Sequence, residues 1–198
     1  MIQIPNINPT GLETAAYWED FLSKEDLELL TNLKEWNKTS EAQVGGTSKD
    51  IKSDSNIRRT NISWLPFEEK FYPIYNRFAE VIAEVNSKFF HLNISHIAEQ
   101  SQLGLYTEKD KDHYDWHTDA SPYDRLYPRK LSMILMLSDS DEYEGGELQI
   151  KTNHQDLILE SKKGRAWFFP SYLLHRVTPV TKGTRKTLVT WITGEAFK

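Results

Sequence analysis

The run Leu131-Ser-Met-Ile-Leu-Met-Leu137 is almost continuously apolar, as expected for a β-strand that is buried on both faces. It lies in a region that begins at Ile94, where clusters such as Asp139-Ser-Asp, Glu144-Gly-Gly and Lys182-Gly separate short apolar stretches. This punctuation is typical of an all-β region. It predicts eight strands, at residues 94–107, 113–119, 131–138, 146–151, 156–160, 165–170, 174–180 and 184–193. Eight short strands favour a double-sheet jelly roll.

Two helices are predicted before this region. The first begins at Ser23-Lys-Glu-Asp26, which resembles an N-terminal capping box, and continues at helical spacing through Leu27, Leu30 and Leu33. The second is predicted by an apolar stripe at intervals of three and four residues, formed by Phe71, Ile74, Tyr75, Phe78, Ile82, Val85 and Phe89. We expect both helices to pack on one sheet, which makes the fold mainly β with packing helices. One domain is predicted over 1–198, with 1–93 as helical support and 94–198 as the jelly-roll core.

Two polar stretches are predicted to be loops. Residues 37–56 contain Gly45-Gly46 and many Ser, Thr, Lys and Asp residues, and residues 120–130 are rich in Tyr, Asp and Arg. Each stretch is either a lid over a functional site or a solvated connection. Residues 57–65, after the first of them, predict a short strand.

Composition narrows the class of protein. The 198 residues include 24 Lys and Arg, 29 Asp and Glu, 6 His and no Cys, with a net charge of −5. The mildly acidic balance disfavours a nucleic-acid partner, since affinity for phosphate backbones depends on basic residues. Without cysteine, a metal could be held only by nitrogen and oxygen ligands. The sequence has no signal-peptide pattern and no apolar run near the roughly 18 residues that span a membrane. We therefore expect a cytoplasmic protein without a membrane partner.

The triplet His117-Thr-Asp119 is the most informative chemical signal. Side chains two residues apart on a strand share a face, so a histidine and a carboxylate would converge there. His175 lies 58 residues later on a strand that a jelly roll can place opposite. Two imidazoles and one carboxylate form the facial triad of non-heme Fe(II) oxygenases. The triplet taken alone is weak, since single histidines are more often hydrogen-bonded core or surface residues.

Arg185 strengthens the metal hypothesis. It begins the last predicted strand, ten residues after His175. A guanidinium group facing an open metal site could bind the far carboxylate of an oxoacid that chelates the metal. The alternative is a surface arginine beside Lys182 and Lys186.

Taken together, these features resemble the 2-oxoglutarate/Fe(II)-dependent oxygenases. The resemblance is to the prolyl 4-hydroxylase-like branch, including the PKHD-type hydroxylases, and covers roughly residues 94–194. It rests on His117-Thr-Asp119, Gly145-Gly146-Glu147-Leu148, Trp167-Phe-Phe-Pro170-Ser, His175-Arg-Val-Thr-Pro-Val180, Gly183-Thr-Arg185 and Leu188-Val-Thr-Trp191-Ile.

The resemblance implies a double-stranded β-helix with Fe(II) and 2-oxoglutarate as cofactors, and ascorbate as a further candidate. It implies iron ligation by His117, Asp119 and His175. Arg185 and Tyr106 would bind the distal carboxylate of 2-oxoglutarate. Val177 and Trp191 would line the substrate pocket, although each also suits an ordinary core position.

The implied function is hydroxylation of a prolyl or other residue in a peptide or protein. A free amino acid or another small molecule is the alternative substrate. A cupin-like enzyme with zinc or manganese, and a non-catalytic jelly-roll metal-binding module, are the alternative classes. The sequence does not indicate an oligomeric state.

Overall fold

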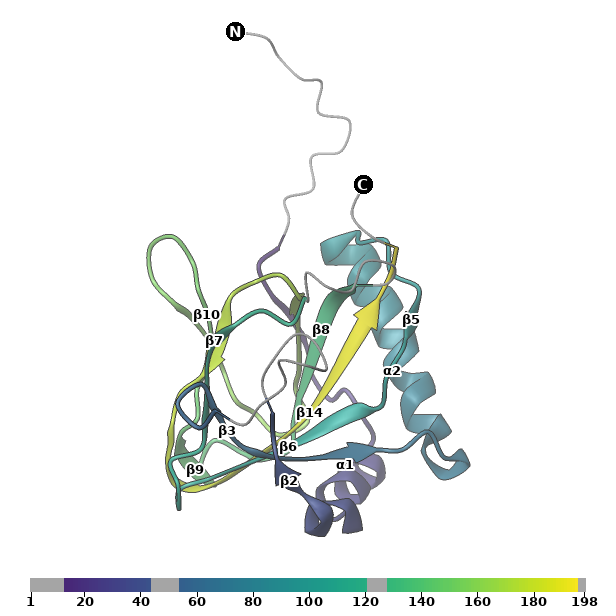
Figure 1. The fold of residues 1–198 in the computed structure, drawn as a ribbon. Coiled ribbons are helices and arrows are strands. Elements are labelled where there is room, and N and C mark those ends of the chain that lie inside the picture. Colours follow the sequence, from purple (N-terminus) through teal and green to yellow (C-terminus); the bar gives the residue numbers. More distant parts are fainter. Residues whose placement is uncertain (1–12, 44–53, 121–127, 196–198) are drawn as a thin grey trace, which may run out of the picture.

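Figure 1 shows the computed structural model of the chain, which describes residues 13–43, 54–120 and 128–195. Residues 44–53 and 121–127 fall within the two predicted loops and lie outside the described residues. Whether either loop is a lid therefore stays a prediction.

The helices begin where the sequence predicts. Helix α1 (Lys24–Thr31) follows Ser23, whose hydroxyl accepts a 3.0 Å hydrogen bond from the backbone N–H of Asp26. Helix α2 (Tyr72–Val85) carries the second apolar stripe and continues as a π-helical turn over Asn86–Phe90. A 3₁₀ turn over Lys34–Lys38 follows α1, and another over Glu69–Phe71 directly precedes α2.

The described residues form two antiparallel sheets. The larger contains β1, β12, β8, β14, β6, β4 and β2 in that order, with β5 and β9 also paired to β14. The smaller contains β11, β10, β13, β7 and β3. The strands are β1 (Ala16–Trp18), β2 (Ser40–Glu41), β3 (Arg58–Arg59), β4 (Asn61–Leu65), β5 (His96–Ile97), β6 (Ser101–Thr107), β7 (His113–His117), β8 (Arg129–Met136), β9 (Tyr143–Gly145), β10 (Leu148–Ile150), β11 (Leu157–Leu159), β12 (Ala166–Pro170), β13 (His175–Val177) and β14 (Val180–Thr193). This arrangement confirms the predicted mainly-β jelly roll.

Strand alternation divides the apolar side chains between two cores. Leu131, Met133 and Leu135 of β8 pack with the apolar side of α2, whereas Ile134 and Met136 pack between the two sheets. Figure 1 shows α2 covering one side of the larger sheet. Strand β8 is therefore buried on both faces, as its sequence predicts.

The N-terminal part contributes more than helical support. Strand β1 extends the larger sheet beside β12, and the predicted strand 57–65 divides at Thr60. Its first half, β3, pairs with β7 in the smaller sheet, while β4 pairs with β6 in the larger one. The chain thus passes from one sheet to the other at Thr60, which places Arg58 beside the strand that carries His117.

Several predicted strand boundaries differ from the structure. The strand predicted over 94–107 forms two strands, β5 and β6, and the one predicted over 113–119 ends at His117. The break predicted at Lys182-Gly183 is absent, because β14 runs through both residues. Gly183 has a φ of 73°, and a Cβ atom there would lie 2.1 Å from the carbonyl oxygen of Glu142. This glycine allows β14 to leave its partner β9 and continue beside β6 and β8.

Candidate active site

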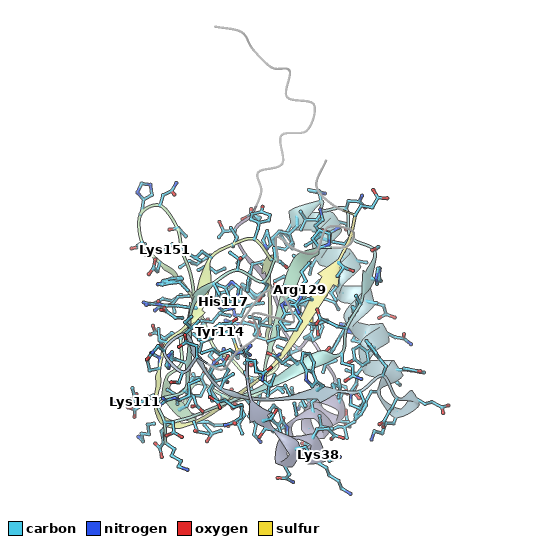
Figure 2. All side chains as sticks on the ribbon, viewed as in Figure 1. Lys38, Lys111, Tyr114, His117, Arg129 and Lys151 are labelled. Atoms are coloured by element: carbon cyan, nitrogen blue, oxygen red, sulfur yellow. The ribbon has the colours of Figure 1, made fainter. Side chains whose placement is uncertain are left out.

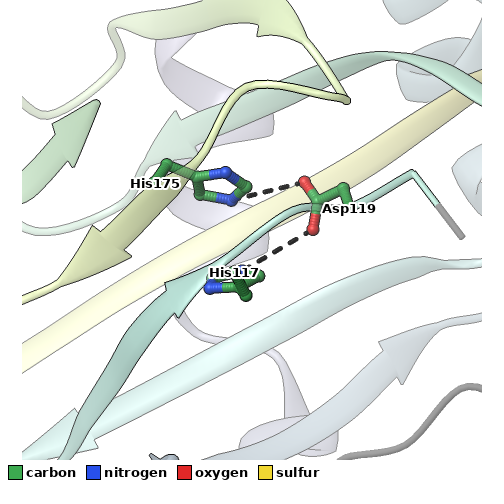
Figure 3. Close-up of side chains that lie close together, drawn as sticks. All are labelled: His117, Asp119 and His175. Carbon is green, nitrogen blue, oxygen red and sulfur yellow. Dashed lines mark ion pairs between the residues drawn. The ribbon is translucent and has the colours of Figure 1, made fainter. Parts of the chain in front are cut away.

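The smaller sheet brings two of the predicted ligands together. His117 at the end of β7 is the direct antiparallel partner of His175 at the start of β13. Their ring centres are 4.2 Å apart. Asp119 lies two residues beyond β7, and Figure 3 shows its carboxylate between the two imidazoles. Residues 58 positions apart in the sequence therefore form one cluster.

Asp119 is held by contacts outside the predicted strand. Its backbone N–H donates a 2.9 Å hydrogen bond to the carbonyl oxygen of Ser171. The hydroxyl of Ser132 on β8 donates a 2.7 Å hydrogen bond to Oδ2 of Asp119, and Ser132 and Ser171 also share a 2.9 Å hydrogen bond. The larger sheet thus positions the carboxylate against histidines that belong to the smaller sheet.

The ligand atoms of the cluster fit one metal ion. Oδ1 of Asp119 is 3.7 Å from Nε2 of His117, and Oδ2 is 3.5 Å from Nε2 of His175. One ligand atom from each of the three residues lies within 4.8 Å of the others. A metal bound at about 2.1 Å to each would draw neighbouring ligand atoms to about 3 Å in octahedral geometry. Only a small inward movement separates the present distances from that arrangement.

The imidazole orientations also suit metal binding. Nδ1 of His117 lies 2.8 Å from the carbonyl oxygen of Asp115, and Nδ1 of His175 lies 2.9 Å from that of Leu173. A carbonyl oxygen only accepts hydrogen bonds, so each Nδ1 carries the proton. Each Nε2 then has a free lone pair directed at the cluster.

The environment favours the protonation states that bind metals. Burial, with a further contribution from nearby His175, lowers the pKa of His117 from 6.5 to about 3. Burial alone would raise the pKa of Asp119, but the two imidazoles and the Ser132 hydrogen bond outweigh it and lower that pKa. At neutral pH the cluster therefore offers a neutral His117 and an ionised carboxylate.

Tyr114 supports the cluster but has no role in the sequence prediction. Its ring stacks on the imidazole of His117, with ring centres 3.4 Å apart and an interplanar angle of 12° (Figure 2). Regular alternation would place residues 114 and 117 on opposite faces. However, His117 pairs with His175 and Tyr114 pairs with Val177. A distance of three residues along β7 is therefore matched by two residues along β13. This irregularity brings both rings to one face.

Arg185 and Tyr106 lie together on the inner side of the larger sheet. They are direct partners on β14 and β6, and the guanidinium carbon is 5.2 Å from the centre of the tyrosine ring. Arg185 is only 2% exposed, and its Nε has no hydrogen-bond partner among the residues that the structure describes. Within the described ranges no carboxylate pairs with it, so an acidic ligand could neutralise this buried charge.

Arg185 also borders a cavity of about 260 Å³ beneath β9, β10 and β11. Gly146 forms part of its wall with a φ of 60°. A Cβ atom at this glycine would lie 3.0 Å from Cδ of Arg185 and 2.9 Å from Val180. Because Gly146 has no side chain, the side chain of Arg185 can pack directly against its backbone.

The two predicted pocket residues are buried at different places. Val177 belongs to the core between the sheets, with Tyr106 and Ile134. Trp191 on β14 is 6% exposed, and its indole N–H lies near enough to Asp119 to help lower that pKa without forming a hydrogen bond. Whether both line a substrate pocket stays a prediction.

Two histidines and one carboxylate are the ligand set used by non-heme Fe(II) oxygenases. Comparison with known proteins agrees. Residues 101–193 match the family model described as the 2OG-Fe(II) oxygenase superfamily. This range contains every site residue predicted above. This match spans just under half of the chain, and over that region the chain is similar to the superfamily that its motifs resemble.

The chain is similar in sequence to several PKHD-type hydroxylases. One from Synechococcus sp. (strain CC9605) is 44% identical over 80 residues, which are 40% of this chain and 36% of that protein. Another, from Crocosphaera subtropica, is 27% identical over 178 residues, which are 88% of this chain and 76% of that protein. The chain thus aligns with about a third of the first relative and about three quarters of the second.

A solved structure supports the fold. The prolyl hydroxylase of Trichoplax adhaerens, in complex with a peptide fragment of the hypoxia inducible factor oxygen degradation domain, superposes with a TM-score of 0.72. The match covers 90% of this chain and 83% of that one, at 16% sequence identity. The predicted jelly-roll fold is therefore confirmed independently of close sequence similarity.

Proposed function

We propose that the chain is an Fe(II)- and 2-oxoglutarate-dependent hydroxylase in which His117, Asp119 and His175 bind the metal. The convergence of their three ligand atoms within 4.8 Å carries the proposal. The directed Nε2 lone pairs and the ionised carboxylate support it. The match of residues 101–193 to the superfamily model and the similarity to PKHD-type relatives support the choice of iron and 2-oxoglutarate over zinc or manganese alone.

When bound, iron and 2-oxoglutarate supply the oxidation of a C–H bond by dioxygen. The protein supplies geometry. The backbone carbonyls at Asp115 and Leu173 fix the imidazoles, and Ser132 fixes the carboxylate. His117, Asp119 and His175 would hold the metal through three protein atoms, and the metal could also bind the cosubstrate and dioxygen.

Arg185 and Tyr106 would bind the distal carboxylate of 2-oxoglutarate. The buried guanidinium, whose Nε has no hydrogen-bond partner among the described residues, supports this role, because a carboxylate would neutralise it and accept hydrogen bonds from it. Val177 and Trp191, both buried, would exclude water from the space around the metal.

The substrate that we propose is a prolyl residue in a peptide or protein. The peptide bound to the Trichoplax adhaerens prolyl hydroxylase supports a peptide substrate by analogy of fold. A free amino acid is the alternative. Ascorbate as a further cofactor and a cytoplasmic location stay predictions. In the part of the chain that the structure describes, no helix is long and apolar enough to cross a membrane.

The test is turnover of 2-oxoglutarate to succinate by protein loaded anaerobically with Fe(II), then exposed to oxygen with proline-containing peptides and free amino acids. We expect His117→Ala and Asp119→Ala to abolish succinate formation. His113→Ala is the matched control, since His113 lies on the same strand and its ring nitrogens lie within hydrogen-bond distance of backbone carbonyl oxygens. Succinate formation that survives in both ligand variants would rule out the metal assignment.

A further inference from the structure

In the part of the chain that the structure describes, three buried N–H donors around the active site have no hydrogen-bond partner: Nε of Arg58, Nε of Arg185 and Nε1 of Trp191. The proposed function assigns Arg185 to the cosubstrate and places Trp191 beside Asp119. It assigns nothing to Arg58, although unpaired buried donors are costly and uncommon in folded proteins.

The ring of Tyr114 separates Arg58 from His117, a proposed metal ligand. Its guanidinium carbon is 4.4 Å from the centre of the Tyr114 ring, and that ring stacks on His117. Because the imidazole covers one face of the phenol, the guanidinium group packs against the other face. Arg58 is 8% exposed, and its Nη2 donates a 2.7 Å hydrogen bond to Oε1 of Gln102. A nearly enclosed positive charge therefore sits beside the active site with a neutral amide as its partner.

A second arginine near the same site provides a comparison. Arg129 stacks on Trp191 at 3.7 Å and forms two hydrogen bonds with the carboxylate of Glu99, at 2.7 and 2.9 Å. Burial raises the pKa of Tyr114, and the charges of both arginines partly oppose that rise. Arg129 thus has its own carboxylate, whereas no carboxylate pairs with Arg58 in the described part of the chain.

The cosubstrate does not account for Arg58. Gln102 and Tyr106 are four residues apart on β6, which separates their backbones by roughly 13 Å. The distal carboxylate of 2-oxoglutarate belongs at the Tyr106 end, with Arg185, and its other carboxylate belongs at the metal. A different acid must therefore reach Arg58 if its charge is to be neutralised.

We propose that Arg58 binds a carboxylate of the substrate, so that the enzyme acts on a molecule with an acidic group close to the carbon that is hydroxylated. The proposal rests on the proposed function and narrows its substrate class. The carboxylate could come from a free amino acid or from an acidic side chain next to a prolyl residue. A planar guanidinium group suits either one through paired hydrogen bonds.

The experiment measures binding by calorimetry, without turnover, to the full chain loaded with Mn(II) and 2-oxoglutarate in the absence of oxygen. Two matched pairs of probes are used: L-proline against L-prolinamide, and a capped peptide with Glu-Pro against the same peptide with Gln-Pro. We expect the acid of at least one pair to bind about tenfold or more tightly than its amide, as charge-assisted hydrogen bonds predict. The pair that discriminates identifies the source of the carboxylate.

Variants then assign the preference to Arg58. Arg58→Gln should remove it, Arg58→Lys should keep part of it, and Arg59→Gln should leave it unchanged. Arg59 is the matched control because it is adjacent on β3 and bonds instead to the carbonyl oxygen of Asp110. If Arg58→Gln does not fold, Arg58→Lys still tests the proposal, since loss of the fork geometry should weaken only the acidic probes.

Equal binding of acids and amides by the wild type, or an acid preference that persists in Arg58→Gln, overturns the proposal. So does a loss of 2-oxoglutarate affinity in Arg58→Gln without an effect on the probes. Failure of the wild type to bind Mn(II) and 2-oxoglutarate is a different result, which contradicts the proposed function itself.

Discussion

The ring of Tyr114 lies against the imidazole of His117, with ring centres 3.4 Å apart. The irregular pairing of β7 with β13 creates this contact. Arg58 then covers the second face of the phenol ring, at 4.4 Å. A proposed metal ligand is thus held by a stack that begins on an edge strand of the smaller sheet.

Replacing Tyr114 should test whether this stack orients His117. Tyr114→Ala should weaken Mn(II) binding about two- to tenfold, because an aromatic pair contributes about 0.5–1.5 kcal/mol beyond its burial. Tyr114→Phe keeps the ring and should bind Mn(II) as the wild type does. Metal titration of the two variants checks this expectation, and equal affinity in both would show that the stacking has no effect on the ligand.

Ser132→Ala should shift the pH dependence of metal binding. The Ser132 hydroxyl helps to lower the pKa of Asp119, so its removal should raise that pKa. Because the carboxylate must be ionised to bind a metal, half-maximal Mn(II) binding should move to higher pH. Ser138→Ala, which removes another buried serine hydroxyl remote from the cluster, is the control. An unchanged midpoint in Ser132→Ala would contradict the assigned role.

The metal-free protein should lose stability in acid. The pKa of His117 is 6.5 when unfolded and about 3 when folded, so between these values the unfolded chain binds more protons. Its contribution to stability is therefore complete above 6.5 and is lost as the pH falls towards 3. Thermal unfolding across this window should show a shallower decline for His117→Gln than for the wild type or His113→Gln. Parallel curves for all three proteins would exclude His117 as a source of the decline.

Gly146→Ala should weaken 2-oxoglutarate binding about tenfold and leave Mn(II) binding unchanged. The added methyl group would press on Cδ of Arg185 at 3.0 Å, in a backbone conformation that costs about 1–2 kcal/mol for alanine. Gly164→Ala carries the same backbone strain, with a φ of 84°, but among the described residues its methyl group would meet only Leu27, at 3.3 Å. The control should lose stability without losing 2-oxoglutarate affinity. Equal affinities in the two variants would mean that Gly146 does not position Arg185.

Sequence spacing could predict the jelly roll and the convergence of His117, Asp119 and His175. The apolar run of β8 and the turn residues contain the local information that defines most strands. Arg185 was predicted to begin the last strand, and it lies within β14 instead because Gly183 bends that strand without ending it.

Other parts of the site depend on contacts that local patterns do not encode. Asp119 lies beyond the end of β7, where Ser171 and Ser132 hold it. Strand alternation therefore predicts correctly that Asp119 lies near His117, but these contacts, and not alternation, are the cause. Tyr114 faces the cluster only because the pairing of β7 with β13 is irregular. Arg58 reaches the site because the chain changes sheets at Thr60, which requires knowledge of both sheets.

Calorimetric titration of 2-oxoglutarate into the protein, with and without Mn(II), under anaerobic conditions tests the central claim most directly. The account predicts tight binding only with the metal, and loss of binding in Asp119→Ala. It also predicts weakening of about tenfold or more in Arg185→Gln, through loss of a charge-assisted pair. Binding that is independent of Mn(II), or unchanged in Arg185→Gln, would contradict the assignment of this site to 2-oxoglutarate and iron.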